Sequence, residues 1–98
     1  MPLIRHAAYF RLKHPAGSPA EAAFLDAIGR LQSIPGVEKF EVARQVSAKS
    51  EFAFGVAMEF ADQAAYDGYN VHPDHVRFVK DRWVPEVEAF AEIDTVAL

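Results

Sequence analysis

The chain has 98 residues, of which 51% are hydrophobic and 24% are charged. This length suits one domain, residues 1–98, and the apolar share is sufficient to fill a single core. Ten Lys and Arg residues stand against 14 Asp and Glu residues, a net charge of −4, so the chain lacks the positive excess with which proteins bind nucleic acid or anionic membranes.

The sequence contains no cysteine, which excludes a disulfide, a thiolate metal site and a cysteine nucleophile. The first residues show no basic region followed by an apolar run, and no apolar stretch reaches the length of a membrane span. We therefore expect a cytoplasmic protein that binds neither a membrane nor nucleic acid.

Residues 3–12 favour a β-strand with one face more apolar than the other. The more apolar face carries His6, Ala8, Phe10 and Leu12. A helix is predicted next, because Ser18, Pro19 and Glu21 have the types and spacing of an N-cap, a first helical residue and a capping box. Apolar residues then recur at helical spacing until Pro35-Gly36 ends the helix.

The middle of the chain predicts a β-hairpin. Residues 37–46 favour a strand, and the polar residues 47–50 have the length of a hairpin loop. The following strand has the clearest two-residue period in the sequence. Its apolar face carries Phe52, Phe54, Val56, Met58 and Phe60.

Two helices and a strand complete the chain. Asp62 has the type of an N-cap for a short helix, and His72 with Pro73 begins another, which places His75 at the third helical position. Pro85 is expected to kink or restart that helix, and residues 91–98 favour a strand. The order predicts an α+β domain of the βαββαβ type, a four-stranded antiparallel sheet with helices on one face.

The other face of this sheet has no helix to cover it. It is predicted to carry Ala7, Tyr9, Ala53, Gly55 and Ala57, or the phenylalanine row if the third strand faces the other way. Either set is too apolar to remain in water. We therefore predict a homodimer in which the open faces of two sheets pack together.

Three segments of the sequence carry a family resemblance. They are Ile4-Arg5-His6, then Ile34-Pro35-Gly36-Val37 leading into Phe40-Glu41-Val42-Ala43-Arg44, and finally Tyr69-Asn70-Val71-His72-Pro73-Asp74-His75-Val76-Arg77-Phe78-Val79 with its HPxH motif. Together they resemble the stress-responsive A/B-barrel domain family, Dabb, over nearly the whole chain. The resemblance implies a ferredoxin-like protomer that dimerises into an eight-stranded α/β barrel.

The resemblance implies several functions and does not choose among them. One plant member, olivetolic acid cyclase, closes a linear polyketide by aldol condensation without a cofactor, and other members look like stress-induced, stable oligomers. Carried over by position, His75 would be the base, Tyr69 would assist it and His6 would line the pocket, with no cofactor. The alternatives are a non-catalytic structural oligomer and a cofactor-free monooxygenase, so whether the chain is an enzyme stays open.

The three candidate residues each have a chemical and a structural interpretation. Imidazole titrates near neutral pH, which suits His75 to general base catalysis, but the same ring could simply hold the helix entry. Tyr69 could donate a hydrogen bond to an enolate-like oxygen, or be a half-buried aromatic residue. His6 could line a pocket, or be a hydrogen-bonded core histidine.

Further residues are expected to contact a small ligand or to belong to the core beside it. These are Phe24, Val56, Met58, Phe78, Val79 and Trp83. No metal is predicted, because His72 and His75 have no third ligand at a recognisable spacing. Four arginines could pair with a carboxylate ligand, although surface ion pairs are their more common role. They are Arg5, Arg11, Arg44 and Arg82.

Overall fold

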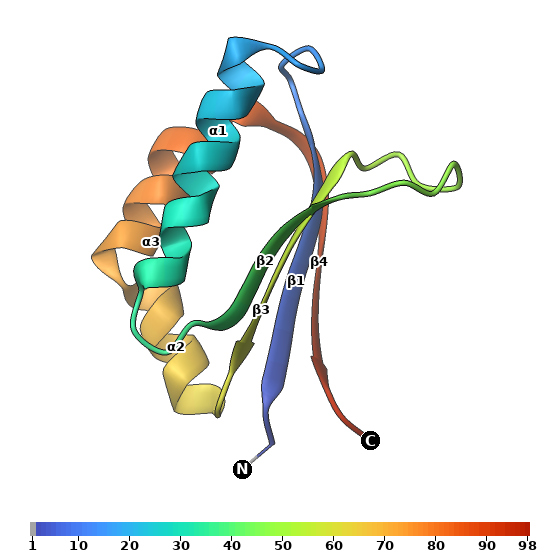
Figure 1. The fold of residues 1–98 in the computed structure, drawn as a ribbon. Coiled ribbons are helices and arrows are strands. Elements are labelled where there is room, and N and C mark those ends of the chain that lie inside the picture. Colours follow the sequence, from blue (N-terminus) through green and yellow to red (C-terminus); the bar gives the residue numbers. More distant parts are fainter. Residues whose placement is uncertain (1) are drawn as a thin grey trace.

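The computed structural model describes residues 2–98 and contains a four-stranded antiparallel sheet with the order β2-β3-β1-β4. The strands are β1 (Ile4–Leu12), β2 (Glu38–Arg44), β3 (Phe54–Phe60) and β4 (Val87–Val96). The helices are α1 (Pro19–Gly29), α2 (Gln63–Val71), α3 (Pro73–Phe78) and α4 (Val84–Glu86). All of them lie on one face of the sheet (Figure 1), which confirms the predicted α+β architecture.

The cap of α1 explains where this helix begins. Ser18 Oγ accepts the N–H of Glu21 at 3.2 Å, and Pro19 occupies the first turn, as the sequence predicts. The Glu21 carboxylate accepts the N–H of Gly17 at 3.1 Å, one residue before the N-cap. The helix then tightens into a 3₁₀ turn, η1 (Arg30–Ser33), before Pro35-Gly36.

The predicted caps of the next two helices are also present. Asp62 Oδ1 accepts the N–H of Ala65 at 2.9 Å and begins α2. His72 Nδ1 accepts the N–H of Asp74 at 3.1 Å and begins α3, with Pro73 in its first turn. This cap places His75 in the first turn of α3, beside the end of α2.

After α3 the helix widens into a π-helical turn, η2 (Val79–Trp83), in which the N–H of Val84 donates to the carbonyl of Val79. Pro85 follows this turn directly. Proline cannot donate to the carbonyl four residues earlier, and its ring clashes with that carbonyl, so a regular α-helix cannot continue through it. The expected restart at Pro85 is therefore confirmed, and it takes the form of the short helix α4.

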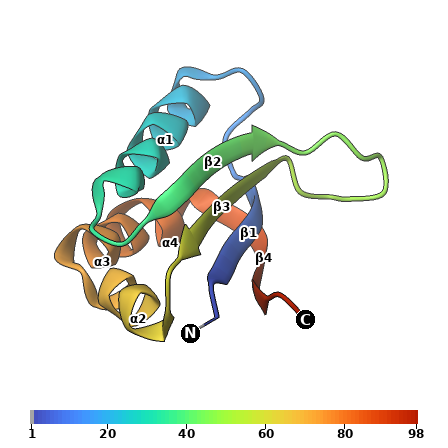
Figure 2. The same cartoon turned by 60° about the horizontal axis from the view of Figure 1, so that its bottom comes forward.

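Two predicted boundaries are wrong. Residues 87–90, expected to be helical, form the start of β4, whose pairing with β1 runs from Val87 opposite Leu12 to Val96 opposite Ile4. The chain extends as soon as α4 ends, because Val87 can pair with the far end of β1. The connection between β2 and β3 covers residues 45–53 rather than 47–50, and projects as a long arm (Figure 2).

The phenylalanine row of β3 faces the helices. Phe54, Val56, Met58 and Phe60 belong to the core cluster, together with Phe10 of β1. The other face of the sheet therefore carries Ala7, Tyr9, Gly55 and Ala57 of the first predicted set. The prediction for Ala53 is wrong, because this residue precedes β3 and packs against the core cluster. The Tyr9 ring lies so close to Gly55 that a Cβ there would come within 2.9 Å of it.

Within residues 2–98, no helix combines the length and hydropathy needed to cross a bilayer.

Candidate functional site

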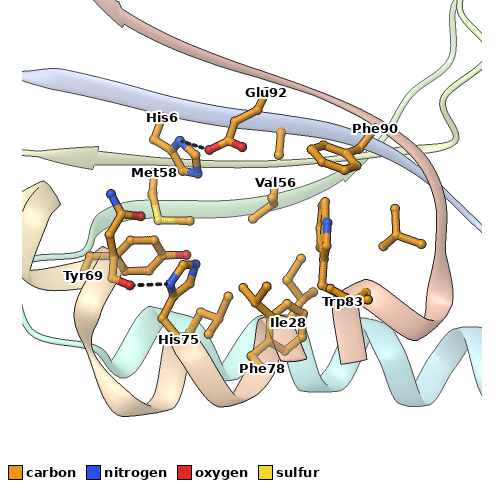
Figure 3. A pocket seen from close by; sticks show the side chains of 16 residues that line it. His6, Ile28, Val56, Met58, Tyr69, His75, Phe78, Trp83, Phe90 and Glu92 are labelled. Atoms are coloured by element: carbon orange, nitrogen blue, oxygen red, sulfur yellow. Dashed lines mark hydrogen bonds and ion pairs between the residues drawn. The ribbon is translucent and has the colours of Figure 1, made fainter. Parts of the chain in front are cut away.

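A cavity of about 550 Å³ lies between the sheet and the helical layer (Figure 3). Eight of the nine residues predicted for the site line it: His6, Val56, Met58, Tyr69, His75, Phe78, Val79 and Trp83. The polar side chains among all the lining residues are those of His6, Tyr69, Asn70, His75 and Glu92. An apolar chamber of this volume with a few polar groups has the character of a small-molecule site.

Phe24, the ninth predicted residue, does not line the cavity. Its side chain has 0% exposure and lies behind two of the residues that line the cavity, Phe78 and Trp83. The Phe24 ring centroid is 5.6 Å from that of Phe78 and 6.3 Å from that of Trp83. Helical periodicity identified Phe24 as facing the interior. It could not distinguish a side chain that lines the cavity from one that packs behind the lining residues.

The π-helical turn explains why Phe78 and Trp83 pack on the same residue. In an α-helix, two residues five positions apart point about 140° away from each other. The wider π turn brings residues at this spacing closer to one face. As a result Phe78 and Trp83 both contact Phe24 from inside the molecule and both present surface to the cavity.

His75 is held in one tautomer. Its Nδ1 lies 3.2 Å from the carbonyl oxygen of Asn70, at the end of α2. Because a carbonyl only accepts, Nδ1 donates, and Nε2 of the neutral ring is left as the acceptor. Figure 3 shows this side of the imidazole turned toward the cavity.

The surroundings of His75 favour its neutral form. Burial lowers the pKa of the imidazole below its ordinary value of 6.5, an effect that the Asn70 carbonyl partly opposes. At neutral pH the ring is thus an uncharged base with an available lone pair. Burial is the leading cause of this shift.

Tyr69 lies beside this base. The ring centroids of Tyr69 and His75 are 4.3 Å apart, and Tyr69 is only 2% exposed, so it is fully buried rather than half-buried. Burial raises the pKa of the Tyr69 phenol above its ordinary value, which keeps the hydroxyl protonated. Within residues 2–98 this hydroxyl makes no hydrogen bond, so it is available as a donor to a ligand.

His6 occupies the sheet side of the cavity and belongs to a polar cluster that the sequence did not predict. Its Nδ1 donates to Asp94 Oδ1 at 2.6 Å, and Tyr66 donates its hydroxyl proton to Asp94 Oδ2 at 2.8 Å. The Tyr66 oxygen also lies 3.1 Å from His6 Nδ1. Asp94 therefore fixes the tautomer of His6, as the Asn70 carbonyl does for His75. The two predictions for His6 are both met, because the ring is hydrogen-bonded and lines the cavity.

One set of side chains has the composition of a cation site. His6, Glu92 and Asp94 bring potential donor atoms within 4.8 Å of one another. However, His6 Nδ1 is hydrogen-bonded to Asp94, and both carboxylates are substantially exposed. We assign no metal to this cluster.

Sequence reasoning missed the residues that β4 contributes to the site. Phe90 and Glu92 line the cavity, and Asp94 supports His6 from the same face of β4. Their alternation along the chain is a signal, but it was hidden because residues 87–90 were expected to be helical. The pairing of His6 with Asp94, which lie 88 residues apart, has no local signal at all.

The sequence matches the profile of the Stress responsive A/B Barrel Domain over residues 4–97. The chain belongs to the Dabb family. A solved Dabb family protein with a ferredoxin-like fold from Mesorhizobium loti is 57% identical to it, with a TM-score of 0.97 and coverage of 100% of this chain and 99% of that one. The comparison with curated proteins found no match.

More distant solved structures share the fold. A hydroxynitrile lyase from Passiflora edulis is 17% identical, with a TM-score of 0.84 and coverage of 99% of this chain and 94% of its own. A dimeric ferredoxin-like protein from Thermobifida fusca is 20% identical, with a TM-score of 0.80 and coverage of 98% and 92%. The cofactor-independent oxygenase SnoaB from Streptomyces nogalater is 12% identical, with a TM-score of 0.72 and coverage of 99% and 94%.

These likenesses establish the family and the ferredoxin-like fold, and they show that proteins of this fold include dimers, a lyase and an oxygenase.

Proposed function

We propose that this Dabb protein binds a small organic carbonyl compound and catalyses proton abstraction next to the carbonyl without a cofactor, as a cyclase or lyase on a polyketide-like substrate. The observation that carries this proposal is the arrangement of His75. A neutral imidazole whose Nδ1 is occupied presents Nε2 to an apolar cavity, directly beside a protonated phenol. This is the pairing of a base with an oxyanion donor that enolate chemistry needs.

The proposed reaction begins when His75 Nε2 removes a proton from the carbon next to the carbonyl. The electron pair of that C–H bond forms the carbon–carbon double bond of an enolate, whose oxygen accepts a hydrogen bond from Tyr69. The enolate carbon then attacks a second carbonyl of the folded substrate and forms a carbon–carbon bond. The new alkoxide takes the proton back from the His75 imidazolium, so the base is regenerated and the atoms balance.

The cavity contributes orientation and exclusion of water. Val56, Met58, Phe78, Val79 and Trp83 supply apolar walls that would hold the reacting carbons close together. A low-polarity environment also strengthens the hydrogen bond from Tyr69 to a developing oxyanion.

The test is exchange of hydrogen for deuterium next to a ketone, followed by NMR in D₂O with acetophenones and 1,3-diketones. We expect the parent protein to accelerate exchange, and His75→Gln to lower that acceleration by about a hundredfold or more. Tyr69→Phe should lower it by a comparable factor. Val76→Ala is the matched control, since Val76 is the neighbour of His75 on α3 and is 51% exposed.

The competing candidate is a non-catalytic stress-associated oligomer in which His75 is structural. The bond from His75 to Asn70 supports it, because this bond joins the end of α2 to α3. In that case His75→Gln lowers the melting temperature and no ketone exchanges faster than in buffer. A cofactor-free monooxygenase would use the same base, and oxygen consumption with quinol-like compounds separates it from a cyclase.

We further propose that the protein acts as a homodimer through the open face of the sheet. This face carries Tyr9 and Ile93, which are 39% and 51% exposed, and no helix lies over it (Figure 1). Proteins of this fold that are described as dimeric support the proposal. Light scattering should give twice the 10.9 kDa of one chain, and a monomeric mass at micromolar concentration would contradict it.

The lack of cysteine supports a cytoplasmic location.

A further inference from the structure

The cavity lining contains an acidic side chain and no Lys or Arg to balance it. Among the residues that line the cavity, Glu92 is the one acidic side chain. His75 adds no charge, because its pKa is lowered. Asp94 places a second carboxylate next to the same end of the cavity, on the same face of β4.

The basic side chains that could have balanced this charge are engaged elsewhere. Arg11 donates to Glu51 and Glu88, and Arg82 lies 2.8 Å from Glu86. Arg5 lies 3.8 Å from Glu59, and Arg44 stacks over the ring of Phe54. Arg5, Arg11 and Arg82 form the expected ion pairs. Arg44 has a cation–π contact instead, and none of the four lines the cavity.

Glu92 makes one long contact within the protein, with His6 (Figure 3). Its Oε1 lies 3.7 Å from His6 Nδ1, which is too long for a hydrogen bond, and Nδ1 is already held by Asp94 at 2.6 Å. The Glu92 side chain is 50% exposed. Half of this side chain is therefore open to solvent, and pairing with a ligand would break no hydrogen bond of Glu92 within the protein.

Two aromatic side chains, Phe90 and Trp83, line the same cavity as Glu92. Phe90 lies two residues away on the same face of β4, is 52% exposed, and its ring centroid is 5.4 Å from that of Trp83 in an edge-on arrangement. Both rings line the cavity (Figure 3). A carboxylate beside aromatic faces is a favourable setting for an ammonium group, through an ion pair and cation–π attraction.

We infer that the substrate of this site carries a protonated amine, which Glu92, Phe90 and Trp83 bind while its carbonyl faces the Tyr69 hydroxyl and His75 Nε2 from the cavity. The inference rests on the proposed function and names its substrate class as an amino-carbonyl compound. It also disfavours carboxylated and phosphorylated compounds, since Glu92 and Asp94 repel an anion and no Lys or Arg lines the cavity.

The test uses three ketones of matched size and different charge at pH 7.5. They are 4-(aminomethyl)acetophenone, 4-(hydroxymethyl)acetophenone and 4-acetylbenzoate, which are cationic, neutral and anionic. Dissociation constants come from titrations followed by Trp83 fluorescence and by ligand NMR. We expect the cationic ketone to bind about fivefold more tightly than the neutral one, the size of a partly exposed ion pair. The anionic ketone should bind most weakly.

Glu92→Gln should abolish the preference for the cationic ketone while leaving the affinity for the neutral one within about twofold. Asp26→Asn is the matched control, because it removes the same charge from an exposed position on α1. In this control the preference should persist. Raising the salt concentration should reduce the preference of the parent protein.

The outcomes separate the inference from the proposed function. If the ketones bind equally, or if Glu92→Gln keeps the preference, the inference fails while deuterium exchange by His75 can still stand. If the cationic ketone is preferred but His75→Gln exchanges its methyl protons as fast as the parent does, the base assignment fails and the ammonium site stands. If none of the three ketones binds at millimolar concentration, both fail.

Discussion

Replacing Phe24 should lower the stability of the protein without changing its affinity for a ligand, because Phe24 does not line the cavity. Its side chain is 0% exposed and packs against three aromatic rings, those of Phe10, Phe78 and Trp83, at centroid distances of 5.6, 5.6 and 6.3 Å. Truncation of a fully buried phenylalanine to alanine costs about 3–5 kcal/mol, out of a total that is about 5–15 kcal/mol for domains in general. The more conservative Phe24→Leu should cost about 1 kcal/mol.

Urea denaturation followed by fluorescence measures this cost directly, because Trp83 is the single tryptophan and contacts Phe24. We expect Phe24→Ala to lower the free energy of unfolding by about 3–5 kcal/mol. Phe24→Leu should remain folded and bind ketones with the affinity of the parent protein. The reasoning is refuted if Phe24→Ala costs less than about 1 kcal/mol, or if folded Phe24→Leu loses ligand binding, since Phe24 would then reach the cavity.

Three further predictions concern pH, the polar cluster and the open face of the sheet. Because burial lowers the pKa of His75 below 6.5, the unfolded state takes up a proton before the folded state does as the pH falls. The contribution of His75 to the free energy of unfolding should therefore be complete above about pH 6.5 and decline as the pH falls toward the lowered pKa. Urea midpoints measured from pH 5 to 8 should vary less with pH for His75→Gln than for the parent protein. Tyr66→Phe removes a donor to Asp94 and should cost about 1 kcal/mol in urea denaturation; an unchanged midpoint would show that solvent replaces the hydroxyl. Gly55→Ala would place a Cβ within 2.9 Å of the Tyr9 ring and should weaken the proposed dimer in sedimentation, whereas parent-like association would place the interface elsewhere.

The sequence predicted the elements with strong local signals. Ser18, Asp62 and His72 have the side chains that cap helices, and each does so in the structure. The alternation in β3 predicted which residues share a face, and the structure shows that the phenylalanine row faces the core. Such features depend on a few neighbouring residues, so one sequence is enough to show them.

Features that depend on distant pairing could not be predicted. The early start of β4 follows from its register with β1, in which Val87 lies opposite Leu12. The cluster of His6, Tyr66 and Asp94 joins three separate elements, so no spacing in the sequence marks it. Glu92 was overlooked for the same reason, because its place in the cavity depends on the register of β4.

The proposed function requires His75 to be a neutral base whose Nε2 is unprotonated at neutral pH. The most direct measurement is a ¹⁵N-detected NMR titration of the four histidines, with His75→Gln to assign the signal. We predict an Nδ1–H tautomer for His75 and a pKa below 6.5, in agreement with its bond to Asn70 and its burial. An Nε2–H tautomer, or a pKa at or above 6.5, would contradict the proposed role of His75 as the base.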